Sequence, residues 1–162
     1  VFNVLGPLTN PAGARRQLLG VFSPALLKPL AEVLRNLGSE RALIVHGGGL
    51  DEISASGETR YALLSEDGKI KEGALTPEDA GVARTTEKMV VDTVQQSAEI
   101  IRRVFAGDKR PERAAVLLNA GGALWAAGRA SSLKDAVEMA AQTIDSGAAA
   151  RTLDKVVKIT NG

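Results

Sequence analysis

The first third of the chain places two short apolar runs on either side of one amphipathic segment. Residues 17–22 and 41–45 are apolar and rich in branched side chains, a pattern typical of buried strands. Between them apolar residues recur at helical spacing: Leu26, Leu27, Leu30, Val33, Leu34 and Leu37. Ser23 and Pro24 form a helix start, and Gly38 forms a stop. A crossover of this length favours parallel pairing, so the pattern predicts a strand, helix, strand unit.

The middle of the chain changes to a hairpin pattern. Residues 58–64 and 69–74 read as strands, and Asp67 with Gly68 between them supplies the residues that a tight hairpin turn prefers. Residues 76–79 then carry a cap, a proline and early acids, which predicts a short turn of helix.

From about residue 92 the spacing is helical. Helices are predicted at residues 94–105, 111–127, 132–146 and 148–159, with Gly107, Gly128 and Gly147 as stops. We therefore expect one α/β domain over residues 1–162, with a mostly parallel sheet, an added β-hairpin and a helical C-terminal half.

The composition narrows the function classes. The chain has 162 residues, 44% of them hydrophobic, with 20 basic and 19 acidic side chains and a net charge of +1. This balance gives no electrostatic basis for general attraction to nucleic acid or membranes. Cysteine is absent, which excludes disulfides and thiolate metal sites and agrees with a cytoplasmic setting. No apolar run approaches the ~20 residues that span a bilayer.

The candidate chemistry lies directly after the second predicted strand. Three glycines at 47–49 end the strand where backbone must approach something closely, and Asp51 and Glu52 follow. Open α/β sheets bind ligands at this end of their strands, and adjacent carboxylates suit Mg²⁺ shared with a substrate phosphate. The alternative is that Asp51 and Glu52 only open a loop or cap a short helix. The ten residues from Val45 to Ser54 leave both interpretations open.

Two other polar residues have simpler structural interpretations. His46, the only histidine, lies at the end of a strand without an evident partner acid, which is more typical of a structural histidine than of a general base. Asn119, Gly121 and Gly122 interrupt an apolar helix. Each glycine costs about 1 kcal/mol relative to alanine in a helix interior, so the two glycines need a reason. Close helix packing, with Asn119 bonding buried backbone, is favoured over direct contact with a ligand.

Several blocks of the sequence resemble the anthranilate phosphoribosyltransferase family. The blocks are residues 2–11, 20–23, 45–54, 75–79, 118–120 and 144–149, and they run in the family's order over nearly the whole chain. The resemblance implies the nucleoside phosphorylase and phosphoribosyltransferase catalytic fold and an enzyme of tryptophan biosynthesis. It also implies a homodimer joined through an N-terminal helical domain.

The resemblance also implies that part of the enzyme is missing. The family places its glycine-rich pyrophosphate loop and its helical domain upstream of the block that begins here. The chain starts at Val1 with apolar residues that read as the middle of an element, so we expect it to be a fragment. The resemblance implies that this fragment is the C-terminal part of the catalytic domain and that it is inactive alone.

By resemblance, individual residues receive roles. Asp51 and Glu52 match the pair that binds Mg²⁺ bridging to phosphoribosyl pyrophosphate, and Gly6 and Pro7 match a turn that lines the path of the aromatic acceptor. Residues 89–98 depart from the family's paired glycines and asparagine, so this segment is interpreted as a capped helix start.

The implied reaction transfers the phosphoribosyl group from phosphoribosyl pyrophosphate to anthranilate. Two alternatives remain: a pyrimidine nucleoside phosphorylase of the same fold, and a non-catalytic paralogue that binds nucleic acid.

Overall fold

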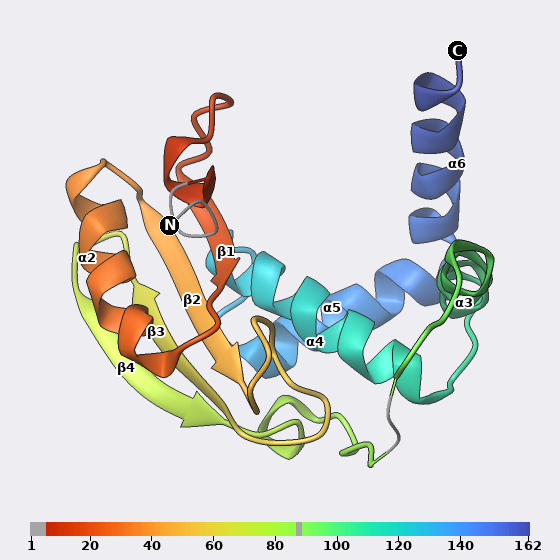
Figure 1. Ribbon diagram of the computed structural model, residues 1–162, viewed down its shortest axis with the longest axis horizontal. Helices are drawn as coiled ribbons and strands as arrows, with labels where there is room; N and C mark the ends of the chain where they lie inside the picture. Colours follow the sequence, from red (N-terminus) through yellow and green to blue (C-terminus); the bar gives the residue numbers. More distant parts are fainter. Residues whose placement is uncertain (1–5, 87–88) are drawn as a thin grey trace.

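The computed structural model describes residues 6–86 and 89–162 (Figure 1). It begins with the short 3-10 helix η1 (Gly6–Thr9) and strand β1 (Arg16–Gly20). A second 3-10 turn, η2 (Pro24–Leu26), leads into helix α2 (Leu27–Asn36). The Ser23 side chain caps η2 by accepting from the backbone N–H of Ala25. The predicted helix start is therefore correct, but its first turn is a tight 3-10 turn.

The sheet has four strands in the order β1-β2-β3-β4. Strand β2 (Arg41–Gly47) pairs in parallel with β1, as the crossover predicts. Strands β3 (Thr59–Leu64) and β4 (Ile70–Leu75) form the predicted antiparallel hairpin, and β3 also pairs antiparallel with β2. The expectation of a mostly parallel sheet is therefore wrong for the described strands. The hairpin joins the sheet directly at β2, so one pairing is parallel and two are antiparallel.

Two apolar clusters fill the two faces of the sheet. Along β2, Ala42 and Ile44 join the cluster beneath α2, while Leu43 and Val45 join the cluster on the opposite face. That second face is covered by α4 (Pro111–Ala126), which packs on α5 (Leu133–Asp145) (Figure 1). Strand β2 is thus buried on both faces, which explains its unbroken apolar run.

The helical half follows the predicted boundaries closely. A turn of 3-10 helix, η3 (Glu78–Ala80), precedes α3 (Val94–Phe105), whose bounds are those predicted. The Thr93 hydroxyl caps α3 by accepting from the N–H of Gln96 at 3.2 Å, so the capped start is confirmed. The last helix, α6 (Ala148–Thr160), projects away from the sheet (Figure 1). None of its residues is buried.

The two glycines inside α4 allow close packing, as predicted. A Cβ at Gly121 would lie 2.7 Å from Val137 Cγ2 on α5, and a Cβ at Gly122 would lie 2.5 Å from Ile53 Cδ1. Both distances are too short for real contacts. At Gly121 the Val137 backbone nitrogen would also lie 3.0 Å away, so a side chain there would press on backbone, whereas at Gly122 it would press on the end of the Ile53 side chain. None of the described helices has both the length and the apolar character needed to cross a membrane.

Candidate metal site

The acidic loop, residues 47–55, begins with a tight reversal of the chain. Gly47 and Leu50 exchange two backbone hydrogen bonds of 3.0 Å, which closes a two-residue turn. The residues inside the turn, Gly48 and Gly49, have φ angles of 60° and 91°. Positive φ at both positions favours glycine, and this accounts for the glycine run. Asp51 and Glu52 consequently lie just beyond the carboxyl end of β2.

The backbone of the acidic loop also crosses the strand ends at very short range. A Cβ at Gly20, the last residue of β1, would lie 2.5 Å from the carbonyl carbon of Asp51. A Cβ at Gly47 would lie 2.6 Å from the backbone nitrogen of Ser54. Only glycine fits at either position. The role of Gly20 was not predicted from the sequence. The one feature that indicates a close backbone approach there is a glycine at the end of an apolar strand.

Buried residues anchor the loop directly after the acidic pair. Ile53 and Ser54 are almost fully buried, with 0% and 1% of their surface exposed. The Ser54 N–H donates to Thr59 Oγ1 at 2.9 Å, and Ser54 Oγ accepts from the N–H groups of Ser56 and Gly57 at 3.2 and 3.1 Å. The exposed side chains of Asp51 and Glu52 are therefore followed directly by a buried, hydrogen-bonded segment of the loop.

The electrostatics of the pair favour a cation. Partial burial, and secondly the neighbouring charge of Asp51, raise the pKa of Glu52 above its usual value. Within the described part of the chain, neither carboxylate forms an ion pair with a basic side chain. Across residues 6–86 and 89–162, no three or more His, Cys, Asp or Glu side chains are grouped so that they could hold a metal ion by themselves. Two oxygen-donating side chains nevertheless fit Mg²⁺, which keeps several waters and shares substrate phosphates.

His46 has a structural partner beside the acidic loop. Its Nδ1 donates to the backbone carbonyl of Val21 at 2.8 Å, and the Val21 N–H in turn donates to the Val45 carbonyl at 2.9 Å. These two bonds extend the pairing of β1 and β2 past the end of β1. The bond to Val21 gives His46 the backbone partner that a structural histidine needs.

Asn119 holds the acidic loop from the helical side. Its Oδ1 accepts from the Ile53 N–H at 2.9 Å, and its Nδ2 donates to the Ile53 carbonyl at 3.0 Å. The expectation that Asn119 bonds buried backbone is thereby confirmed. The sequence could not identify the partner, which lies 66 residues away.

Gly6 and Pro7 lie away from the acidic pair. Pro7 borders a cavity of about 140 Å³ together with Arg15 and Gln17, at the start of β1. Asp51 instead borders a crevice beside Gly20, at the other end of the same strand. The structure therefore does not bring the two predicted sets of site residues together.

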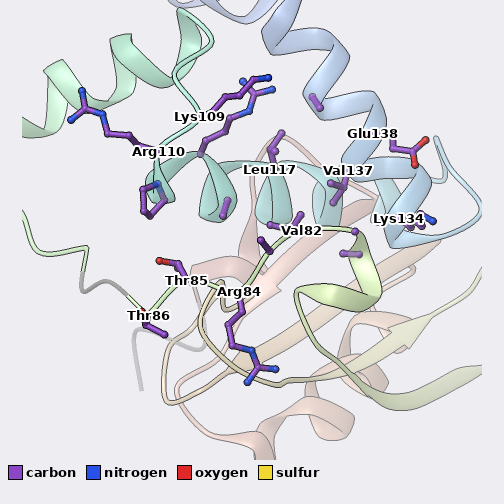
Figure 2. Close-up of a pocket in the computed structure, with 17 residues that line it drawn as sticks. Val82, Arg84, Thr85, Thr86, Lys109, Arg110, Leu117, Lys134, Val137 and Glu138 are labelled. Carbon is purple, nitrogen blue, oxygen red and sulfur yellow. The ribbon is translucent and has the colours of Figure 1, made fainter.

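Another cavity lies apart from both sets of predicted residues. It has a volume of about 820 Å³ and is bordered by residues 80–86, α4 and α5 (Figure 2). Arg84 and Arg110 point away from it in different directions (Figure 2). Arg84 pairs with Glu78, and Arg110 pairs with Asp108. Because these two guanidinium groups are directed out of the cavity into ion pairs, we place the candidate site at the acidic loop.

Comparison with curated proteins finds close relatives along the whole chain. The chain is 46% identical over 162 residues to the anthranilate phosphoribosyltransferase of Chelativorans sp. strain BNC1, and the match covers 99% of this chain and 48% of that protein. With the corresponding protein of Rhodopseudomonas palustris strain BisA53 it is 50% identical over 163 residues, with the same coverage. The chain thus spans about half the length of these relatives.

Solved structures agree with the sequence relatives. Anthranilate phosphoribosyltransferase from Thermus thermophilus matches with a TM-score of 0.86 and 40% identity, over 99% of this chain and 48% of that one. The Saccharomyces cerevisiae enzyme in complex with PRPP and Mg matches with a TM-score of 0.78 and 29% identity, over 94% of this chain and 45% of that one.

A family model assigns the chain directly. The model described as the a/b domain of a glycosyl transferase family matches residues 1–150. This match covers the sheet, the acidic loop and α4, and it confirms the resemblance and the α/β fold class expected from the sequence. The chain is a member of this glycosyl transferase family.

Proposed function

We propose that the chain is part of an anthranilate phosphoribosyltransferase. Such an enzyme transfers the phosphoribosyl group from phosphoribosyl pyrophosphate to anthranilate in tryptophan biosynthesis. The observation that carries the proposal is the exposed pair Asp51 and Glu52, held on a rigid loop at the carboxyl ends of β1 and β2. The identity with curated enzymes of this name supports it.

In the proposed reaction the anthranilate nitrogen forms a bond to C1 of the ribose. The bond from C1 to the pyrophosphate oxygen breaks, its electron pair leaves with pyrophosphate, and the nitrogen loses a proton. Asp51 and Glu52 would hold Mg²⁺, which when bound offsets negative charge on the leaving pyrophosphate. The part of this chain is to fix where those two carboxylates stand, since catalysis of this type can rest on positioning and electrostatics without a protein nucleophile.

The proposal includes the arrangement of the whole enzyme. Residues 1–162 would form the C-terminal part of the catalytic domain, while the pyrophosphate-binding loop and the helical domain that joins a homodimer would lie outside this chain. Gly6 and Pro7 would line the path of anthranilate. The enzyme would be cytoplasmic, with no nucleic-acid or membrane partner.

A fluorescence assay of the complete protein tests the proposal. With phosphoribosyl pyrophosphate and Mg²⁺ present, anthranilate fluorescence should fall, and the fall should stop when Mg²⁺ is chelated. Release of a pyrimidine base from uridine or thymidine with phosphate, and no loss of anthranilate, would favour the phosphorylase. Salt-dependent DNA binding without transfer would favour the nucleic-acid-binding paralogue. The chain by itself should be inactive.

A further inference from the structure

Asn119 holds in place the two peptide groups on either side of the Ile53 Cα in the acidic loop. The Ile53 N–H that it accepts belongs to the peptide bond joining Glu52 to Ile53. Its Nδ2 donates to the Ile53 carbonyl and also to the Ala115 carbonyl, one turn earlier in α4, at 3.1 Å. The bond to Ala115 fixes the side-chain conformation of Asn119, so the amide acts as a rigid bracket between α4 and the residue after Glu52.

The same short stretch of α4 also receives the Ile53 side chain. Gly122 leaves room for it, since a Cβ there would lie 2.5 Å from Ile53 Cδ1. Ile53 is fully buried, and it follows directly after the exposed Glu52. The backbone and the side chain of one residue are therefore both fixed by α4, at the point where the loop leaves the acidic pair.

The sheet holds the other side of the loop. Gly20 and Gly47 allow the loop backbone to lie against the ends of β1 and β2. These contacts limit movement toward the sheet only. The bonds from Asn119 restrain the loop from the side of α4, because they engage both peptide groups that flank the Ile53 Cα.

We propose that Asn119 is a positioning residue for the metal-binding carboxylates of Asp51 and Glu52. The inference rests on the proposed function. Mg²⁺ requires near-ideal octahedral geometry, so ligands on a loose loop bind it poorly. Groups that orient metal ligands typically change metal affinity or activity 10- to 100-fold when they are removed. Asn119 acts through the loop backbone and does not need to touch substrate.

The test uses two Asn119 variants of the complete protein. The readout is the Mg²⁺ concentration that gives half-maximal phosphoribosyl transfer, which does not depend on the fraction of folded molecules. For Asn119→Ala we expect this concentration to rise about 10- to 100-fold. Asn119→Asp preserves the side-chain volume but replaces the Nδ2 donor with an acceptor facing two carbonyls, and we expect a rise in the same range. Its added negative charge alone would lower the concentration.

The control and the contrary results are defined in the same assay. Asn36→Ala, at an exposed position at the end of α2, should keep the wild-type Mg²⁺ dependence. A half-maximal concentration within twofold of wild type in both Asn119 variants would overturn the positioning role while leaving the transferase proposal intact. Absence of transfer by the wild-type protein would instead overturn the transferase proposal, and this inference with it.

Discussion

Replacing Gly20 with alanine should displace the acidic pair without touching either carboxylate. The new Cβ would overlap the Asp51 carbonyl oxygen and would lie 2.5 Å from the carbonyl carbon. Bringing the carbon alone to the 3.4 Å of ordinary contact takes about 0.9 Å, so the loop would have to move by more than that. Since a misplacement of about 1 Å can cost on the order of 10²-fold in rate, we expect a loss of that order in Mg²⁺-dependent turnover. Overpacking should also lower the free energy of unfolding by about 1–3 kcal/mol.

The assay compares turnover per folded molecule in the complete protein. Circular dichroism gives the folded fraction, and anthranilate fluorescence gives the rate over a range of Mg²⁺ concentrations. Gly57→Ala is the matched control, because at Gly57 the nearest heavy atom to the new Cβ is 4.0 Å away. A Gly20→Ala protein that folds and keeps the wild-type rate and Mg²⁺ dependence would refute the reasoning.

Three further predictions concern packing, helix capping and charge. Gly121→Ala should lower the free energy of unfolding in urea by about 1–2 kcal/mol, since its Cβ would lie 3.0 Å from the Val137 backbone nitrogen; equal or greater stability would contradict this. Arg41→Met should cost about 2 kcal/mol in the same measurement, because the guanidinium donates to two carbonyls at the end of α4, at 3.2 and 3.1 Å. In metal-free ¹³C NMR titrations, Asp51→Asn should lower the pKa of Glu52, yet leave it above its usual value, because burial is the larger cause; an unchanged pKa would argue against the described electrostatics.

Local signals in the sequence were sufficient for most elements. The residues that cap or stop a helix lie within a few positions of its ends in the sequence. For this reason α3 and its Thr93 cap agree with the prediction. The Asp67-Gly68 turn likewise specifies a hairpin. Neither signal says which strand the hairpin joins. The proportion of antiparallel pairing was therefore not predictable from these residues.

The site divides in the same way between local and distant information. The glycine turn and the acidic pair are contiguous, so their spacing is readable in the sequence. What holds them is distant: Gly20 meets the Asp51 backbone, and Asn119 meets Ile53 across 66 residues. A sequence pattern can indicate that a glycine allows another backbone segment to approach, or that an asparagine bonds to one. Only the fold identifies which segment that is.

The most direct test of the magnesium site removes the two charges without changing side-chain size. Asp51→Asn with Glu52→Gln is compared with Glu66→Gln with Asp67→Asn, an exposed acidic pair at the hairpin turn. Mn²⁺ binding is followed by electron paramagnetic resonance in the complete protein with phosphoribosyl pyrophosphate. We expect protein-dependent Mn²⁺ binding to be weakened at least 10-fold by the first pair of substitutions and unchanged by the second. Equal Mn²⁺ binding by both variants would contradict the assignment of Asp51 and Glu52 as metal ligands.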